Sequence, residues 1–365
     1  MKPRARDLGI PLEGTPGRYN AITDVPGIQV GHTTLVSGEG RLVVGQGPIR
    51  TGVTAIRVES TGYEPLYAAW HSLNGCGEMT GTTWIEESGF LYGPVLTTNT
   101  MSVGVVHHAV GKWLFENYKI PASLPVVAET YDGFMNDING SHVSPEHVYQ
   151  ALQSAASGPV AEGCVGGGTG MVCHGFKGGI GTASRLLEID QGGYTVGVLV
   201  QANHGSRRQL RVAGAPVGLE ITDLMPEYHS PDEFDLSSSI IVIVATDCPL
   251  LPHQLKRLAR RVPLGIGRVG GLGEHFSGDI FLVFSTKRVG DPDDSGLRQA
   301  VSLRNEKMNP LFFAVVHATE EAILNALVAA ETMHGIKGNT VYALPHDRLQ
   351  VILEQYGLLD RRETG

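Results

Sequence analysis

The stretch from Asp232 to Pro249 reads DEFDLSSSIIVIVATDCP and joins two physically different halves. The first half, which ends at Ser238, is acidic and made of small residues, so it has the polarity of an exposed loop. The second half, Ser239 to Ala245, is SIIVIVA, and a short run rich in β-branched residues predicts a strand that is buried on both faces. A serine therefore lies where an exposed loop enters the core.

Ser239 would be a self-contained catalyst if the chain were cut in front of it. A serine hydroxyl is a weak nucleophile and needs an adjacent base. A free α-amine on the same residue can be that base, because its pKa of roughly 7.7–8 leaves part of it unprotonated near neutral pH. The plainer interpretation is that Ser237, Ser238 and Ser239 form a polar entrance to the strand, and the stretch alone favours it, since loops that end in serine are common.

Composition narrows the class of protein. The 365 residues suffice for one large domain or two modest ones, and the 42% of hydrophobic residues can supply a sizeable core. The net charge of −9 argues against a nucleic-acid partner, which requires a basic patch. The 48 glycines are spread along the chain, so we expect many tight turns and close backbone approaches.

Neither secretion nor a membrane partner is indicated. The N-terminal residues MKPRARDLGIPLEG lack an apolar segment, so we expect no signal peptide. No uncharged apolar stretch approaches the roughly 18 residues that a membrane helix needs. The four cysteines form no C-x-x-C pair, so neither a zinc ribbon nor a disulfide framework is signalled. The predicted location is the reducing cytoplasm.

Short strands and helices alternate along the chain and predict an α/β layered protein without a clear Rossmann plan. Strands are expected over residues 28–30, 42–44, 53–58, 126–128, 196–201, 239–245 and 280–284. Helices are expected over residues 103–118, from Ser144 with Pro145 in first position, over about 250–261 with Asp247 as the cap, and over 319–330. Residues 70–105 and 265–273 are expected to be irregular glycine-rich loops, and residues 70–105 could also form a pocket wall, because glycines let backbone amides approach a ligand closely.

Common catalytic and ligand-binding motifs are missing from the sequence. The glycine-rich segment 163–185 is not a phosphate-binding loop, because Lys177 is followed by Gly178 rather than by serine or threonine. No G-x-S-x-G, S-x-x-K or H-E-x-x-H pattern occurs. The 14 histidines show no ligand spacing, so no metal site is predicted, although a few of them could still meet in space.

The ends of two predicted strands carry polar candidates. Glu129 and Tyr131 are two residues apart where a strand ends, so they point to the same side, and the carboxylate can hold a substrate ammonium. The plainer interpretation, a surface acid beside a half-buried tyrosine, is the one that the residues alone favour. Asn203 follows the strand over residues 196–201, where its amide can either donate to an oxyanion or complete a turn.

An ordered set of short segments resembles a known family. Each segment is weak alone, but together they cover nearly the whole chain and are similar to the L-aminopeptidase/D-esterase family, which includes the β-peptidyl aminopeptidases. The segments are NGCGEMTGTTWIEESG, LTTNTMSVG, ETYDGFMND, GGGTGMVCHGFKGGIGTASR, LVQANHG, SIIVIVATD, SGDIFLVFST and ATEEAILNAL.

The resemblance implies a fold and a maturation step. The fold would be a four-layer α-β-β-α sandwich, with residues 1–365 as one catalytic domain. The precursor would cleave itself between Ser238 and Ser239 into an α subunit of residues 1–238 and a β subunit of residues 239–365. Such enzymes are usually homotetramers of the processed αβ unit and need no metal or cofactor.

The resemblance also assigns the nucleophile and its helpers. Ser239 would be the N-terminal nucleophile, assisted by Ser277 and Asp279 from an S-G-[ED] motif. The chain departs from the family pattern at two points. Ser238 stands before the cleavage point, where glycine or asparagine is usual, so the cut has three adjacent serines to choose from. Asp279 replaces the glutamate of some members, which moves the carboxylate back by one methylene.

Three further residues receive roles from the resemblance. Asn203 would supply the oxyanion hole, Tyr131 would line the site, and Glu129 would hold the free amine of the substrate. The implied reaction is hydrolysis of the N-terminal amide of a short peptide, or of an amino-acid amide or ester, and the sequence does not decide among α-, β- and D-residues. Two alternatives stay open, namely an unprocessed binding protein of the same fold and an acyltransferase that passes the acyl group to an amine instead of water.

Overall fold

Two β-sheets contain most of the strands in the computed structural model, which describes residues 2–59, 63–228 and 238–360. The larger sheet has the order β4 (Phe90–Leu91), β3 (Leu66–Ser72), β12 (Gly278–Ser285), β11 (Ser239–Thr246), β10 (Thr195–Asn203) and β9 (Gly179–Leu186). The smaller sheet has the order β1 (Ile28–Ser37), β2 (Ile49–Val58), β5 (Val95–Asn99) and β6 (Val126–Thr130). Two short hairpins pair β7 (Val172–Cys173) with β8 (Phe176–Lys177) and β13 (Met333–His334) with β14 (Thr340–Val341).

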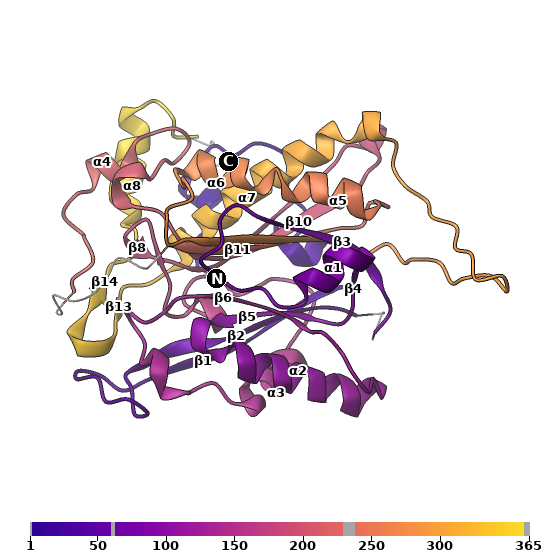
Figure 1. Ribbon diagram of the computed structural model, residues 1–365. Helices are drawn as coiled ribbons and strands as arrows, with labels where there is room; N and C mark the ends of the chain where they lie inside the picture. Colours follow the sequence, from indigo (N-terminus) through magenta and orange to yellow (C-terminus); the bar gives the residue numbers. More distant parts are fainter. Residues whose placement is uncertain (1, 60–62, 229–237, 361–365) are drawn as a thin grey trace.

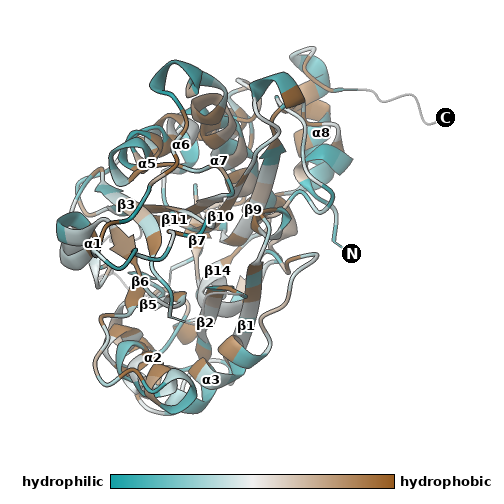
Figure 2. Cartoon of the chain, turned by 90° about the vertical axis from the view of Figure 1, so that its right-hand side faces the viewer, coloured by the Kyte–Doolittle hydropathy of each residue, from teal (hydrophilic) through white to brown (hydrophobic). Residues whose placement is uncertain are grey.

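Helices cover the outer face of each sheet (Figure 1). The larger sheet carries α5 (Pro252–Ala259), α6 (Val262–Val269) and α7 (Asn309–Ala329), and the smaller sheet carries α2 (Val103–Tyr118) and α3 (Pro145–Gln153). The remaining helices are α1 (Thr82–Ser88), α4 (Val217–Glu220) and α8 (His346–Gln355). Figure 2 shows the two sheets stacked between helices whose outer sides are hydrophilic. The predicted α-β-β-α sandwich is confirmed.

β11 is the strand on which the core is built. All of its residues from Ser239 to Thr246 are buried. The side chains of Ile240, Val242 and Val244 pack in the core under the helices of the larger sheet. Those of Ile241, Ile243 and Ala245 pack in the core between the two sheets. The predicted strand with two buried faces is therefore confirmed, whereas the acidic segment before it, up to Ser237, lies outside the described residues.

Several other predicted elements are confirmed. The helix expected over residues 103–118 is α2, and the strand expected over 196–201 lies inside β10. Ser144 is the N-cap of α3, and Pro145 is its first residue. The apolar run after Ser277 is β12. Local periodicity and capping residues suffice in these places because the local signals and the tertiary contacts agree.

Some expectations are wrong because a local pattern is overridden by packing. Residues 42–44 form no strand but part of an exposed turn. Asp247 does not cap a helix, because its Oδ1 accepts a hydrogen bond from the backbone N of Thr195 at 2.8 Å and α5 begins after Leu251. The expected loop 265–273 is helical up to Val269, since Gly265 lets α6 approach α7: a Cβ there would lie 2.6 Å from the carbonyl O of Val316.

Two further expectations are wrong about where regular structure begins. Residues 70–105 are not one irregular loop, because they contain α1 and β5. α7 begins at Asn309, well before Thr319. It is also the one helix among the described residues that is long and apolar enough to cross a bilayer, but 83% of its most apolar window is buried inside the protein. Packing against β9, β10 and α6 accounts for that apolar surface.

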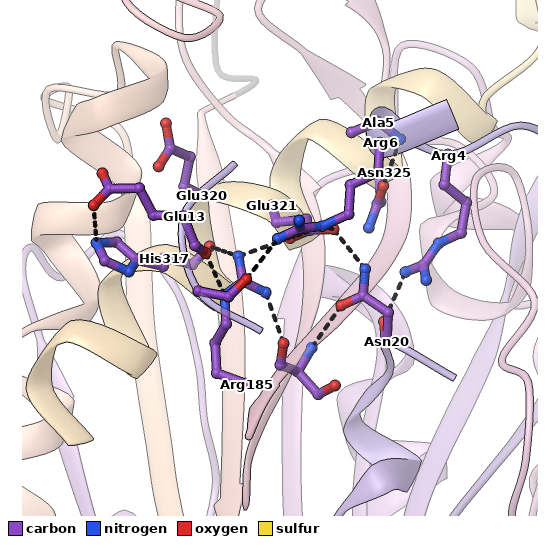
Figure 3. Close-up of polar contacts among 12 residues, drawn as sticks. Arg4, Ala5, Arg6, Glu13, Asn20, Arg185, His317, Glu320, Glu321 and Asn325 are labelled. Carbon is purple, nitrogen blue, oxygen red and sulfur yellow. Dashed lines mark hydrogen bonds and ion pairs between the residues drawn. The ribbon is translucent and has the colours of Figure 1, made fainter. Parts of the chain in front are cut away.

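The N-terminal segment is attached to α7 and β9 by a buried charge network (Figure 3). Glu321 on α7 accepts hydrogen bonds from Arg6 (Nε to Oε1, 2.8 Å) and from Arg185 on β9 (Nη2 to Oε2, 2.7 Å). The side chain of Glu321 is completely buried. Burial alone would raise the pKa of Glu321, but the hydrogen bond from Arg6 and the charge of Arg185 outweigh burial and hold the pKa below its usual value. The network therefore joins residues that are as much as 315 positions apart in the chain.

We expect Glu321→Gln to lower the free energy of unfolding by about 3 kcal/mol, because it leaves Arg6 and Arg185 buried against a neutral group. The measurement is urea denaturation followed by circular dichroism, with Ser239→Ala in every sample so that each is one covalent chain. The control is Glu331→Gln, because Glu331 pairs with Lys2 at the surface, where 72% and 42% of these side chains are exposed. A change within about 0.5 kcal/mol is expected for the control, and equal losses in both variants would contradict the importance of the network.

Candidate active site

The predicted nucleophile lies at the edge of the larger sheet, between two other strands. Ser239 is opposite Asn203 of β10 in the antiparallel register and opposite Gly278 of β12 in the parallel register. The backbone N of Gly278 donates a hydrogen bond to Ser239 Oγ at 3.0 Å. β11 and β12 begin side by side where β10 ends, so the three residues meet at one edge of the sheet. Ser239 is only 4% exposed in the uncut chain.

Ser277 and Asp279 lie beside the start of β11. Ser277 Oγ donates to Asp279 Oδ1 at 2.6 Å, and the same oxygen accepts from the backbone N of Ile240 at 3.2 Å. Asn74 holds the other carboxylate oxygen through its Nδ2 at 3.1 Å. Burial raises the pKa of Asp279, although the hydrogen bonds from Ser277 and Asn74 oppose that effect. The shorter aspartate therefore still contacts Ser277.

Glu129 reaches the site from the smaller sheet. Its side chain accepts hydrogen bonds from the backbone N of Glu78 (Oε1, 2.9 Å) and from the Thr100 hydroxyl. Gly77 lies between Glu129 and the first residue of β12. A Cβ on Gly77 would lie 2.8 Å from Gly278 Cα and 3.4 Å from Glu129 Oε1, so Glu129 is near the start of β12. Glu129 is 4% exposed, so the interpretation as a surface acid is wrong. Burial raises its pKa against the opposing hydrogen bonds.

Asn203 connects the ends of the two sheets. Its Oδ1 accepts from the backbone N of Val172 at 2.7 Å, and its Nδ2 donates to the carbonyl O of Tyr131 at 3.1 Å. An amide nitrogen carries two hydrogens, so the second one remains available to an oxyanion. Tyr131 directly follows β6 and is half-buried, and its ring meets that of Phe134 edge-on with centroids 5.7 Å apart.

Asp132 is a buried carboxyl group that sequence patterns did not single out. Its oxygens accept hydrogen bonds from Nδ2 of Asn99 at 3.0 Å and Nδ2 of Asn136 at 3.1 Å. Burial raises the pKa of Asp132 to about 7, although the hydrogen bonds from the two asparagines act in the opposite direction. The only sequence signal was the presence of asparagine amides, and their convergence on one carboxyl group depends on the fold.

One group of side chains was tested as a metal site. Cys173, His174 and His204 each offer a ligand atom, and these atoms lie within 4.8 Å of one another, although their sequence spacing did not suggest it. The surroundings do not fit a cation. Burial and then the charge of Arg207 lower the pKa of His174 to about 4, and Arg207 Nε donates to the carbonyl O of His174 at 3.0 Å. A guanidinium next to the group would repel a bound metal ion.

A cavity of about 310 Å³ lies beside the predicted site residues. Its walls include Val172, which donates to Asn203, Phe134, which contacts Tyr131, and Glu274, whose carbonyl accepts from the backbone N of Ser277. None of the predicted site residues lines this cavity or the larger one of about 480 Å³ beside α1. The cavity of about 310 Å³ adjoins the site because residues in its wall contact Asn203, Tyr131 and Ser277.

Comparisons with known proteins show which proteins the chain is similar to. The family model "Peptidase family S58" matches residues 20–341. A β-peptidyl aminopeptidase (BapA) of Sphingosinicella microcystinivorans is 54% identical, over 97% of this chain and 92% of its own, and that of Sphingosinicella xenopeptidilytica is 48% identical, over 96% and 91%. The solved L-aminopeptidase D-Ala-esterase/amidase of Ochrobactrum anthropi, described as a prototype serine aminopeptidase with a variant of the Ntn hydrolase fold, has a TM-score of 0.90 and 48% identity, and the match covers 98% of this chain and 100% of that chain.

We expect Asp132 to make the stability of the protein depend on pH. Its pKa is raised from 3.8 to about 7, so between these values the folded protein binds a proton that the unfolded chain has lost, and stability falls as pH rises through this window. Relative to Asp132→Asn, the free energy of unfolding of the wild type should fall by roughly 3 kcal/mol from pH 5 to pH 8.

Urea denaturation at several pH values measures this difference. The control is Asp190→Asn, because Asp190 lies on the exposed surface, and its difference from the wild type should stay within about 0.5 kcal/mol. A constant difference between wild type and Asp132→Asn at all pH values would show that Asp132 keeps the same charge throughout.

Proposed function

The chain belongs to peptidase family S58 and is an aminopeptidase of the serine type, and from this premise we propose that it cleaves itself before Ser239 and uses this residue as its N-terminal nucleophile. The observation that carries the proposal is the position of Ser239. It begins a buried strand and lies between Asn203 and Gly278, with Ser277 and Asp279 beside it. Cleavage there would free an α-amine on the residue that carries the nucleophilic hydroxyl.

The proposed reaction has two steps that balance in protons. Ser239 Oγ attacks the carbonyl carbon of the scissile amide or ester, and its proton passes to the α-amine of Ser239 and then to the leaving amine or alcohol. Water then attacks the acyl-enzyme and gives a proton to the same α-amine, which passes it to Ser239 Oγ as the ester bond breaks and the carboxylic acid product leaves. The Ser277–Asp279 pair supports the amine electrostatically, because Asp279 already accepts a hydrogen bond from the backbone N of Ile240, the next residue.

Asn203 and Glu129 would bind the substrate on either side of the attacked carbonyl. The second hydrogen on Asn203 Nδ2 is suited to the oxyanion, since Asn203 lies opposite Ser239 in the sheet. Glu129 lies near Gly278, on the opposite side of Ser239, and a carboxylate accepts more hydrogen bonds than the two it has here. A substrate ammonium would pair with it, which would give a preference for substrates with a free amine.

The substrates we propose are short peptides and amino-acid amides or esters with a free amine, including those that begin with a β- or D-residue. This choice follows the names of the relatives, which are β-peptidyl aminopeptidases and an L-aminopeptidase D-Ala-esterase/amidase. The same names weigh against a binding protein and an acyltransferase as alternatives. We further propose a cytoplasmic homotetramer of processed αβ units, which the family resemblance suggests.

The two proposed subunits would remain interlocked after cleavage. β11 and β12 belong to the β subunit, yet they lie between β10 and β3 of the α subunit in one sheet. The buried network adds a charged contact, because Arg6 and Arg185 belong to the α subunit and Glu321 to the β subunit. Separation would break two strand pairings and open the core, so a cut in the covalent chain costs the assembly little.

We expect the denatured wild-type protein to give two masses, for residues 1–238 and 239–365, and Ser239→Ala to give one full-length mass. Intact-mass spectrometry after expression and purification measures both. Ser238→Ala is the matched control, because it alters the neighbouring serine and should still be cut before residue 239. A single full-length wild-type chain would contradict self-cleavage, and a cut before Ser238 would move the nucleophile.

We expect Glu129→Gln to lower kcat/KM by about 30-fold for substrates with a free amine, because a charge-assisted hydrogen bond in a buried site is lost. The measurement is steady-state hydrolysis of an amino-acid ester, beside the same ester with an acetylated amine. The blocked ester should be affected much less. Equal losses with both substrates would show that Glu129 does not bind the amine.

A further inference from the structure

The cavity of about 310 Å³ beside Asn203 combines apolar walls with little free charge. The rings of Phe134 and Tyr228 lie 5.2 Å apart in one wall, and Met225 and Pro226 add aliphatic surface. Gly205 and the backbone around it complete the side nearest to Asn203. Such walls suit a side chain with an apolar body.

Two charged residues line the cavity, but one of them is fully occupied. Arg207 donates to the carbonyl oxygens of His174, Gly175, Ile221 and Leu224, and its guanidinium stacks on the Phe176 ring at 3.3 Å. Its hydrogen bonds are thus directed into the protein rather than at a ligand. Arg207 therefore stabilises the wall and does not attract an anion.

Glu274 is the charge that remains available. Only its backbone carbonyl forms hydrogen bonds, to the backbone N of Ser277 at 3.0 Å and to Asn74, whereas its half-buried carboxylate forms neither a hydrogen bond nor an ion pair with the described residues. Its charge acts on the proposed catalytic residues. Burial is the largest cause that raises the pKa of Asp279, the local hydrogen bonds oppose it, and the negative charge of Glu274 raises the pKa of Asp279 further. The cavity therefore presents one unpaired negative charge near the nucleophile.

The position of the cavity relative to Glu129 indicates which part of a substrate it would receive. Glu129 lies beside Gly278, on the β12 side of Ser239. The cavity reaches the β10 side, where its wall residue Val172 donates to Asn203 and Gly205 lies two residues after Asn203, and Glu274 lines it from the segment that precedes β12. A substrate held by its amine at Glu129 and attacked at Ser239 would extend its leaving group toward Asn203 and into the cavity.

We propose that this cavity is the leaving-group pocket and that Glu274 gives the enzyme a preference for a leaving residue with a basic side chain, lysine or arginine. The aliphatic stem would pack on Met225 and Pro226, and the cation would lie near the aromatic rings and the Glu274 carboxylate. An acidic leaving residue would be repelled. This inference rests on the aminopeptidase function proposed above.

The test compares three dipeptide amides that share an N-terminal β-alanine and differ only in the second residue, which is lysine, norleucine or glutamate. Norleucine is the control for lysine because it keeps the aliphatic stem and lacks the charge. For the wild-type enzyme, kcat/KM should be about 10-fold higher with lysine than with norleucine, and lowest with glutamate. The lysine-to-norleucine ratio should fall close to one in Glu274→Gln.

A charge reversal and a matched variant make the test specific. In Glu274→Lys the order should invert, so that glutamate becomes the preferred leaving residue. In Glu78→Gln, which removes an exposed carboxylate on the other side of Ser239, the lysine-to-norleucine ratio should stay at its wild-type value. If this ratio falls equally in Glu78→Gln and Glu274→Gln, the preference comes from the overall negative charge around the site, and the proposed role of Glu274 in the cavity is wrong.

The outcomes separate this inference from the proposed function. Hydrolysis of all three dipeptide amides at equal kcat/KM by the wild type would overturn the leaving-group pocket and leave the aminopeptidase function standing. If the wild type hydrolyses neither these three dipeptide amides nor any other amide or ester with a free amine, both the leaving-group pocket and the aminopeptidase function are overturned. The substrate series on the wild type decides the matter even if a Glu274 variant fails to fold.

Discussion

The pairing of β11 with β10 and β12 is the constraint on which the site depends. A strand that is buried on both faces and hydrogen-bonded along both edges cannot slip, because a shift by one residue would turn its apolar side chains to the wrong layer. The first residue of that strand is therefore held in one place. The same register holds Asn203 and Gly278 in place opposite Ser239, one on each side.

Close backbone contacts extend this arrangement to the second sheet. Gly77 and Gly278 approach so closely that neither has room for a Cβ, and this contact brings the smaller sheet's Glu129 near the start of β12. On the other side, Asn203 binds the carbonyl of Tyr131 and so joins β10 to the chain that leaves β6. The site thus lies where the two sheets meet, and each sheet contributes part of it.

The site gathers acids, while the nearby basic side chains direct their hydrogen bonds to the backbone. Burial raises the pKa values of Glu129, Asp132 and Asp279, which shows that their charges are costly where they lie. Arg207 and Lys177 donate instead to carbonyl oxygens of the chain. An excess of carboxylates with few free cations is suited to substrates that carry an ammonium group, since a bound cation relieves part of that cost.

The sequence by itself determined the elements whose local pattern agrees with their packing, such as the SIIVIVA strand, α2 and the capped start of α3. It also placed the polar candidates at strand ends, and the ordered motifs indicated the family. Only the tertiary structure decided that Glu129 is buried, that Asp247 bonds to β10 instead of capping a helix, and that Asp132 and Glu274 belong near the site. The physical reason is that periodicity and capping act over a few residues, whereas burial and charge depend on segments that are distant in the chain and meet only in the folded protein.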